Sequence, residues 1–257
     1  MLDTTWPKSG SEEIVGESTA LNQALASVQQ LAPSDAAVLI AGERGSGKEL
    51  FARVIHHLSP RRNKSFVKVN CVTSCELLER ELFGFEKEAF DGAISGQAGG
   101  LERADKGTLF LDELARFPLD LQPKLVRVLK RGEFEWSGGT HIVRVDVRFI
   151  AATRHDAAKW IAENRLRQDL YDQFNRSSII QIPPLRERRE DIPLLAQYFV
   201  QKFARRMNKN IEAIAPETMF ALLNYDWPGN VTQLENFIQR AVILTEGSKL
   251  QAPFDEL

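Results

Sequence analysis

The sequence predicts an α/β fold, a parallel sheet flanked by helices, followed by a smaller all-helical subdomain. Short apolar runs alternate with segments of helical periodicity up to about residue 188, and this alternation is typical of parallel sheets. Strand signals then stop, and three segments with helical periodicity follow one another. We therefore expect a linker or a cloning remnant over 1–12, an α/β subdomain over 13–188, a helical lid over 189–245 and a tail over 246–257.

The individual elements follow from runs with strand or helix spacing. Apolar, β-forming runs predict strands at 37–41, 66–71, 107–112, 145–153 and 179–184. Helical spacing predicts helices at 18–31, 48–58, 75–84, 121–130, 191–205, 216–224 and 230–244. Ser18 is expected to cap the first helix, and Asn230 with Gln233 resembles a capping box. The stretch 84–100, rich in Gly, Ala and Ser, predicts a long loop.

Composition and charge narrow the classes of function. The chain of 257 residues is 43% hydrophobic and 26% charged, as in an ordinary globular protein. With 33 basic and 35 acidic residues the formal charge is −2, which disfavours a protein that coats nucleic acid by charge alone. We expect no membrane span and no signal peptide. The two cysteines, Cys71 and Cys75, indicate no disulfide framework and, with the motifs below, suggest a reducing cytoplasm.

The most specific pattern is a glycine-rich turn directly after the first apolar run. Glycines let backbone N–H groups converge on phosphate oxygens, and the positive end of a following helix favours the same anion. Lys48 can reach the terminal phosphates as a point charge, whereas Glu49 stands where the general pattern has Ser or Thr for magnesium. The alternative is a turn that binds nothing. We interpret the pattern as a phosphate-binding loop made of Gly42, Glu43, Arg44, Gly45, Ser46, Gly47, Lys48, Glu49 and Leu50.

A second pattern places two adjacent acids at the end of an apolar strand. Residues 107–114 read Gly-Thr-Leu-Phe-Leu-Asp-Glu-Leu. Because ligands of parallel sheets bind at the carboxyl ends of strands, Asp112 is expected to hold a metal ion through water. Glu113 would polarise an attacking water. A strand that merely ends in a charged turn is the alternative, but the position after a phosphate-binding loop favours a Walker B sequence.

These motifs together resemble one family closely: the AAA+ module of bacterial enhancer-binding proteins, which activate sigma-54 RNA polymerase. The resemblance covers nearly the whole chain. This family also carries Glu after the loop lysine, in agreement with Glu49. The matching strings are Ile14-Val-Gly-Glu-Ser18, Gly42-Glu-Arg-Gly-Ser-Gly-Lys-Glu49, Asn70-Cys71, Glu81-Leu-Phe-Gly84, Gly107-Thr-Leu-Phe-Leu-Asp-Glu-Leu114, Pro184-Leu-Arg-Glu-Arg188 and Trp227-Pro-Gly-Asn230.

The resemblance implies a function and roles for further residues. Modules of this family bind ATP and Mg²⁺ between subunits, form a hexameric ring, and use hydrolysis to remodel a closed promoter complex. Asn70 would match the switch residue that holds the catalytic Glu113, and Arg167 would match an arginine that reaches the neighbour's γ-phosphate. DNA would be contacted through a domain that this chain does not contain. The adenine pocket would be lined by Ile14, Val15 and Gly16.

One departure from the family pattern lies in the loop that touches sigma-54. The family reads Gly-Ala-Phe-Thr-Gly-Ala there. In this chain the aligned residues are Glu88, Ala89, Phe90, Asp91, Gly92 and Ala93. The tip therefore gains two negative charges, which are repelled by promoter phosphates, and residue 88 loses the backbone freedom of glycine. This departure argues against sigma-54 engagement.

Three departures lie on the ATP side. The family's sensor asparagine is replaced by Arg154, the second arginine that reaches the neighbouring subunit by Gln173, and the sensor arginine of the lid by Thr232. An arginine that reaches the transferred phosphoryl group contributes on the order of 10³-fold or more in rate. These losses are expected to weaken hydrolysis more than nucleotide binding.

Two hypotheses of function follow. The first is a ring-forming ATPase coupled to transcription initiation. The second is a nucleotide-binding regulator with weak or no hydrolysis and no sigma-54 engagement, which acts in oligomerisation. A further possibility is a second phosphate-containing ligand, such as a cyclic dinucleotide, held by Arg186, Arg188 and Arg189, although a solvated helix entry is the simpler interpretation of these arginines.

Overall fold

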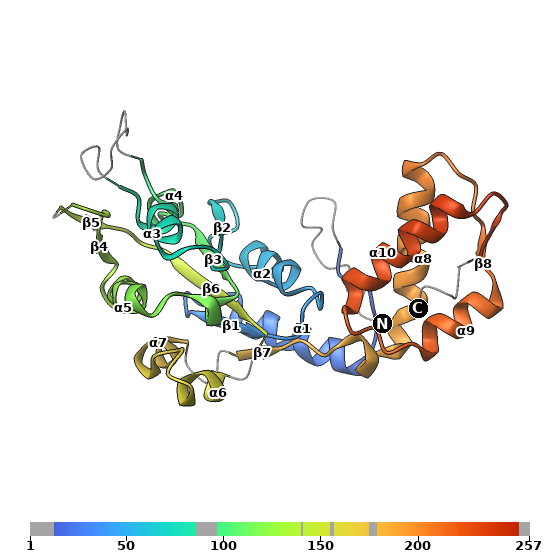
Figure 1. Cartoon of the computed structure of the whole chain (residues 1–257), viewed down its shortest axis with the longest axis horizontal. Helices are drawn as coiled ribbons and strands as arrows, with labels where there is room; N and C mark the ends of the chain where they lie inside the picture. Colours follow the sequence, from blue (N-terminus) through green and yellow to red (C-terminus); the bar gives the residue numbers. More distant parts are fainter. Residues whose placement is uncertain (1–12, 86–96, 140, 155–156, 175–178, 252–257) are drawn as a thin grey trace. The chain divides into compact units, whose positions relative to one another are not determined.

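The computed structural model describes residues 13–85, 97–139, 141–154, 157–174 and 179–251. The chain divides into two units (Figure 1). Among the described residues, an α/β unit contains Ser27–Gly42 and Lys48–Gln181, and a lid unit contains 13–26, Glu43–Gly47 and 182–251. Helix α1 (Thr19–Leu31) contributes residues to both. The subdomain bounds expected from the sequence stay predictions.

The α/β unit is built on a five-stranded sheet with the order β2-β3-β6-β1-β7, in which all neighbours pair in parallel. Asn70 lies opposite Asp112 in register, and Ala41 lies opposite Thr153. The carboxyl ends of these strands therefore share one edge of the sheet. The strands are β1 (Val38–Ala41), β2 (Phe66–Asn70), β3 (Thr108–Asp112), β6 (Arg148–Thr153) and β7 (Ile179–Gln181).

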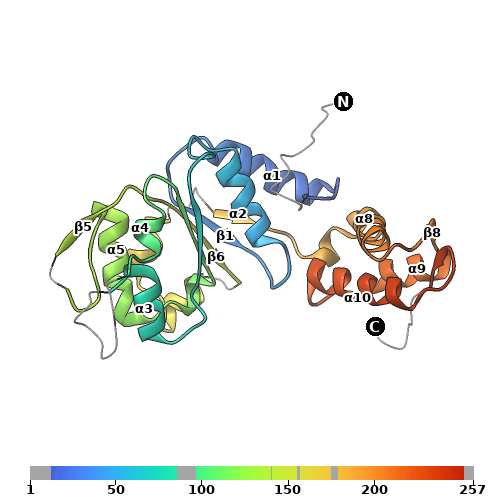
Figure 2. The same ribbon diagram turned by 90° about the horizontal axis from the view of Figure 1, so that it is seen from above.

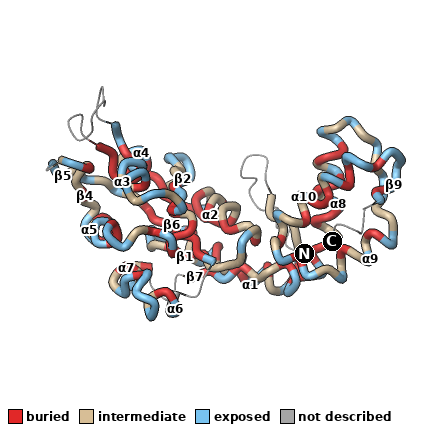
Figure 3. The backbone as a smooth tube through the Cα atoms, in the orientation of Figure 1, coloured by how far each residue is buried: buried red, intermediate tan, exposed pale blue. Residues whose placement is uncertain are grey.

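Helices cover this sheet because its central strands are apolar on both faces. Leu109 and Leu111 of β3 pack into a core with α3, α4, α5 and α7, while α2 contacts β1, β3 and β6. Strand β6 is buried along its whole length, and β1 is buried at its first three residues (Figure 3). The helices are α2 (Lys48–His57), α3 (Cys75–Phe83), α4 (Gly100–Arg103), α5 (Gln122–Arg131), α6 (Ala157–Ala162) and α7 (Gln168–Gln173), with short 3₁₀ turns at Leu114–Arg116 and Leu119–Leu121.

The lid unit is mainly helical. Two 3₁₀ turns (Leu185–Glu187 and Arg189–Asp191) lead into α8 (Ile192–Arg206), α9 (Pro216–Asn224) and α10 (Asn230–Leu244), which gather in one bundle (Figure 2). The two-residue strands β8 (Ala213–Ile214) and β9 (Lys249–Leu250) pair in parallel. Trp227 is fully buried in the core of this bundle, where its indole N–H donates to the Leu222 carbonyl at 2.8 Å.

Several sequence predictions are confirmed and others are wrong. The parallel α/β fold, the five sheet strands and the lid helices are present, although β6 begins at Arg148 rather than at 145. Ser18 caps α1 by accepting the N–H of Leu21 at 3.2 Å. Asn230 does not cap α10, because Gly229 occupies the cap position and Gln233 Oε1 accepts its N–H at 2.8 Å. The hairpin of β4 (Glu133–Glu135) and β5 (Ile142–Arg144) was not anticipated.

The buried guanidinium of Arg148 is satisfied by backbone carbonyls at the end of α1. Arg148 is 1% exposed, and its guanidinium donates to the carbonyls of Ala32 and Leu31 at 2.7 and 2.9 Å, which closes the end of α1. Burial lowers the pKa of Arg148 to about 10. In the parts of the chain that the structure describes, no helix combines the length and the apolar character needed to cross a bilayer.

Candidate functional site

The glycine-rich loop has the backbone conformation that its sequence predicts. Gly45 and Gly47 lie at φ of 75° and 102°, a region that favours glycine. A Cβ at Gly45 would lie 2.2 Å from the Gly229 carbonyl, whereas a Cβ at Gly47 would meet nothing within 4 Å. Ser46 Oγ is buried and has no hydrogen-bond partner in the described part of the chain. An open backbone turn with an unsatisfied hydroxyl fits the oxygens of a phosphate group.

Within the lid unit the loop is held by side chains from distant parts of the sequence. Asn230 Nδ2 donates to the Arg44 carbonyl at 3.0 Å and to Glu43 Oε2 at 3.1 Å. Arg186 forms a two-point ion pair with Glu43, at 2.7 and 2.8 Å. Arg188 Nη2 donates to the Ser46 carbonyl at 3.2 Å. These contacts fix the loop's shape independently of any ligand.

The three arginines near residue 188 differ in their surroundings. Arg186 and Arg189 are exposed and paired with Glu43 and Asp226, as a solvated helix entry predicts. Arg188 is 3% exposed, so that interpretation is wrong for this residue. Burial lowers the pKa of Arg188 below its ordinary value. Its buried guanidinium instead stabilises the loop through the hydrogen bond to the Ser46 carbonyl.

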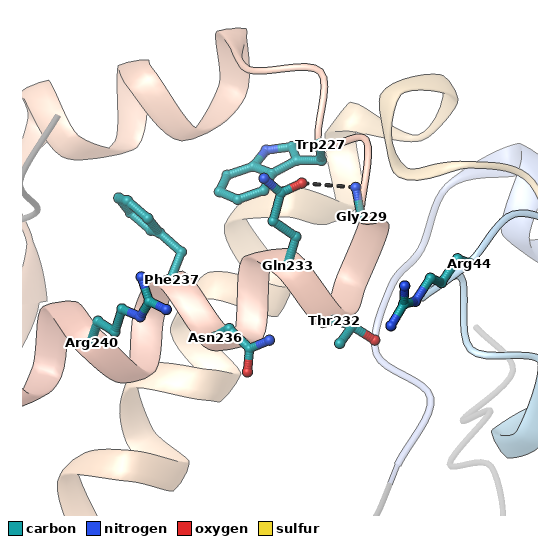
Figure 4. A pocket seen from close by; sticks show the side chains of 8 residues that line it. All are labelled: Arg44, Trp227, Gly229, Thr232, Gln233, Asn236, Phe237 and Arg240. Carbon is teal, nitrogen blue, oxygen red and sulfur yellow. Dashed lines mark hydrogen bonds between the residues drawn. The ribbon is translucent and has the colours of Figure 1, made fainter. Parts of the chain in front are cut away.

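A pocket of about 410 Å³ opens beside the loop in the lid unit (Figure 4). Thr232 and Arg44 point toward one another at one end of it, so the exposed guanidinium lies beside the position at which the family pattern has an arginine. The lining combines cationic, amide and aromatic side chains, and therefore suits a polar ligand with negative charge. It is formed by Arg44, Trp227, Gly229, Thr232, Gln233, Asn236, Phe237 and Arg240.

The predicted adenine segment is held by a carboxylate that the sequence reading missed. Asp191 is fully buried, and its Oδ1 accepts the N–H groups of Glu17 and Ser18 at 2.7 and 2.8 Å. Its Oδ2 accepts the Ser18 hydroxyl at 2.7 Å. Gly16 lies at φ of 145°, and a Cβ there would come within 2.7 Å of Asp191. Ile14 and Val15 precede the residues that are hydrogen-bonded to Asp191, and both are partly buried.

In the α/β unit, three charged groups converge at the carboxyl edge of the sheet. Lys48 begins α2, is 7% exposed, and donates from Nζ to the Gly42 carbonyl at 2.9 Å. Its Nζ lies 3.9 Å from Glu113 Oε1. Arg154 Nε donates to the same Glu113 oxygen at 2.6 Å. The structure thus brings the predicted lysine and glutamate together, and adds Arg154, which follows β6.

The ammonium group of Lys68 lies close to the carboxylates of both Asp112 and Glu49. Lys68 Nζ lies 2.6 Å from Glu49 Oε2 and 3.4 Å from Asp112 Oδ2. Burial acts to raise the pKa of Glu49, but hydrogen bonds from Lys68 and Arg53 outweigh it and lower the pKa. Oxygen ligands of this kind suit Mg²⁺, which keeps several waters. The described residues contain no cluster of three metal-ligating side chains, so a metal here would depend on Asp112, water and phosphate.

The remaining predicted site residues lie apart from this cluster. Asn70 stands beside Asp112 in register, but its Oδ1 accepts the N–H of Val72 at 3.0 Å. Arg167 lies at the start of α7 and forms a two-point ion pair with Asp169, at 2.9 Å for both contacts. Leu50 lies in the first turn of α2. The predicted partner loop, 88–93, is outside the described residues. The roles of all these residues stay predictions.

The site residues that the sequence reading missed are Asp191, Lys68 and Arg53. Asp191 follows the quoted string Pro184-Leu-Arg-Glu-Arg188 by three positions, but nothing in the sequence indicates that it meets Ser18. Lys68 alternates with apolar neighbours in β2. This pattern predicts the strand, but it does not indicate that Lys68 pairs with Glu49 and Asp112. Arg53 stands four residues after Glu49, a spacing that predicts a helical ion pair.

Comparison with known proteins assigns the family. The model of the sigma-54 interaction domain matches residues 14–180, and the model of the AAA+ ATPase lid domain matches residues 186–253. The formate hydrogenlyase transcriptional activator FhlA of Escherichia coli (strain K12) is 51% identical over 246 residues, which are 95% of this chain and 35% of that protein. The transcriptional regulatory protein ZraR of the same strain is 47% identical over 235 residues, 91% of this chain and 53% of that protein.

Solved structures agree with this assignment. Crystal structures of NtrX from Brucella abortus in complex with ATP and with ADP superimpose with a TM-score of 0.87 each, at 40% and 39% identity. Both alignments cover 95% of this chain and 54% of the NtrX chain. The chain thus spans about a third to a half of the length of the relatives it matches. It belongs to the sigma-54 interaction domain family and carries the AAA+ lid of that family.

Proposed function

We propose that the chain is the ATP-binding and ATP-hydrolysing module of a bacterial sigma-54-dependent transcriptional activator that acts in the cytoplasm. The observation that carries this proposal is the open turn at residues 45–47, with its unsatisfied Ser46 hydroxyl, directly followed by Lys48 at the start of a helix. FhlA is named a transcriptional activator, and NtrX has been crystallised with ATP. Both facts support the same function for this chain.

The proposed roles follow the chemistry of each group. Backbone N–H groups of 45–47 and the Lys48 ammonium bind phosphate oxygens. Asp112 would hold Mg²⁺ through water, and a bound ion would supply positive charge beside the transferred group. Glu113 accepts the proton of the attacking water. Residues 14–16 contact the adenine.

Titration calorimetry with Mg-ATP tests nucleotide binding. A charge-assisted hydrogen bond contributes about 1.5–3 kcal/mol, so Lys48→Ala is expected to weaken binding roughly 10- to 150-fold. Lys64→Ala is the matched control, since Lys64 is an exposed lysine outside the loop. Equal affinity of both variants and the unmodified chain would remove Lys48 from the site. Absence of any heat at millimolar Mg-ATP would refute the proposal.

Assembly and binding partners form a further part of the proposal. We propose a ring of copies, with Arg167 directed at a neighbour's nucleotide, and light scattering with and without an ATP analogue measures its formation. The altered loop 88–93 predicts weakened sigma-54 binding. Replacing Glu88 by Gly and Asp91 by Thr is expected to increase sigma-54 capture in the presence of a transition-state analogue. Unchanged capture would contradict the charge argument.

A second candidate function is a nucleotide-binding regulator that scarcely hydrolyses ATP. The ion pair between Arg154 and Glu113 favours it, because the predicted water-activating carboxylate is already engaged. Turnover measured against protein concentration separates the two candidates. If Mg-ATP binds but turnover equals that of Glu113→Ala, the chain is the regulator. Turnover above that background supports the ATPase.

A further inference from the structure

The carboxylate of Glu113 is restrained by the residue that follows the central strand β6. Arg154 Nε donates to Glu113 Oε1 at 2.6 Å, and the Glu113 side chain is only 12% exposed. Lys48 Nζ approaches the same oxygen at 3.9 Å. One carboxylate oxygen therefore faces two cations, in a place where water competes weakly for it.

The resemblance assigns the restraint of Glu113 to Asn70, but the side-chain amide of Asn70 has another partner. Asn70 Oδ1 accepts the N–H of Val72 at 3.0 Å, and the described residues show no hydrogen bond from Asn70 to Glu113. Glu113 itself has left-handed backbone angles, φ 61° and ψ 50°, which a non-glycine residue keeps only when its surroundings hold it there. The guanidinium of Arg154 is a charged group in the immediate surroundings that can do so.

We propose that Arg154 is an inhibitory positioning residue, which holds Glu113 away from the attacking water until a partner or a neighbouring copy draws the guanidinium off. This inference rests on the proposed ATPase function and concerns the regulation of that same site. In hydrolysis the water oxygen bonds to the terminal phosphorus, its proton passes to Glu113, and the bond to the ADP oxygen breaks. The proton acceptor must be a carboxylate oxygen within hydrogen-bond reach of that water.

The geometry supports release as well as restraint. The Arg154 side chain is 36% exposed, against 12% for Glu113, so a partner surface can reach the arginine without entering the site. Arg154 also lies outside the sheet, one residue past the end of β6, where the chain leaves its hydrogen-bonded ladder. A carboxylate brought by a partner would compete for the same guanidinium.

Arg154→Asn tests the proposal through separate measurements of binding and turnover. The Kd for Mg-ATP is expected to stay within about 3-fold, while kcat rises at least about 10-fold, because a positioned general base contributes roughly 10²–10⁴-fold. Arg154→Ala removes the cation without restoring the family's sensor asparagine, and its kcat is expected to rise as well, which assigns the effect to the lost ion pair. Arg154→Lys, which keeps a cation, is expected to give a smaller rise. Arg144→Asn is the matched control, since Arg144 is an exposed arginine of β5 paired with Glu133, and its kcat should be unchanged.

A nucleotide-free measurement checks the restraint itself. In a double-mutant cycle of Arg154→Asn and Glu113→Ala, the urea unfolding equilibria of the chain without ligand should be non-additive by about 2- to 5-fold, as for a partly exposed ion pair. The effect of Glu113→Ala on backbone strain cancels in the cycle, because the same substitution is made once with Arg154 present and once without it.

The outcomes distinguish this inference from the function on which it rests. Normal Mg-ATP affinity with unchanged or reduced kcat in Arg154→Asn would overturn the restraint and leave the proposed function standing. Additive unfolding equilibria would also overturn the restraint, because Arg154 and Glu113 would then have no measurable interaction energy. Failure of both the unmodified chain and Arg154→Asn to bind Mg-ATP would overturn the proposed function and the restraint together.

Discussion

Asn230 is predicted to stabilise the lid unit and the loop at the same time. It is fully buried, and its Oδ1 accepts the Leu185 N–H at 2.7 Å while its Nδ2 donates to the Arg44 carbonyl and to Glu43. Its φ is 53°, in the left-handed region that asparagine and glycine tolerate best. Asn230→Gly removes the side-chain bonds but keeps the backbone geometry, whereas Asn230→Ala removes both.

The magnitudes follow from these contacts. A buried N–H left without a partner costs about 1–3 kcal/mol, and each lost donor bond about 0.5–1.5 kcal/mol. Asn230→Gly is therefore expected to lower the free energy of unfolding by about 3 kcal/mol. Asn230→Ala should cost about 1 kcal/mol more, because its Cβ disfavours positive φ. Asn236→Ala, at an exposed position of the same helix, should stay within about 0.5 kcal/mol of the parent.

Urea unfolding followed by circular dichroism measures these differences, and hydrogen exchange of the Leu185 amide reports the lost bond directly. Exchange at Leu185 should accelerate in Asn230→Gly and remain slow in Asn236→Ala. Should Asn230→Gly unfold at the same urea concentration as Asn236→Ala, with Leu185 equally protected, the reasoning from hydrogen-bond satisfaction is refuted.

Three further changes test other parts of the α/β unit. Burial lowers the pKa of His56 below its ordinary value of 6.5. Neutral His56 therefore contributes its full stability above that pH, and this contribution is lost as the pH falls through the lower pKa of the folded state. The urea midpoints of His56→Gln should vary less between about pH 7 and 5 than those of the parent. Arg148→Met removes the donors to the Leu31 and Ala32 carbonyls at the end of α1 and should cost about 2–4 kcal/mol in thermal or urea unfolding, and a cost below about 0.5 kcal/mol would contradict this. Gly107→Ala places a Cβ 2.3 Å from the Ser65 carbonyl and should cost about 1–3 kcal/mol, while Gly247→Ala, with nothing within 4 Å, is its control. Equal midpoints of the two glycine variants would show that β2 and β3 yield without strain.

The central fold was predictable because its strands are buried on both faces. Such strands read as continuous apolar runs, and Leu109, Phe110 and Leu111 were enough to identify β3. The hairpin β4–β5 and the helices α6 and α7 were not predictable in this way. Their three- and six-residue lengths are too short for a period to be recognised, and β4 and α7 take their position from packing against α5.

The candidate site could be predicted only where the proposed function requires a particular residue type in a particular order. The loop and the pair Asp112 and Glu113 carry such patterns, and the structure places Lys48 beside Glu113. The partners of these groups were not predictable, because contacts such as that of Arg154 with Glu113 join residues 41 positions apart. Side-chain spacing within one element does not determine which strand ends face one another.

The hydrogen bonds from Glu17 and Ser18 to Asp191 limit how the protein can be dissected. They join residues 174 and 173 positions apart, so the residues before α1 acquire their anchor only after the chain has been made through the start of α8. A fragment cut after residue 180, where the match to the first family model ends, would leave the Ser18 hydroxyl and both amides to solvent. Biochemical results from such a fragment would describe a molecule whose N-terminal segment has lost its fixed position.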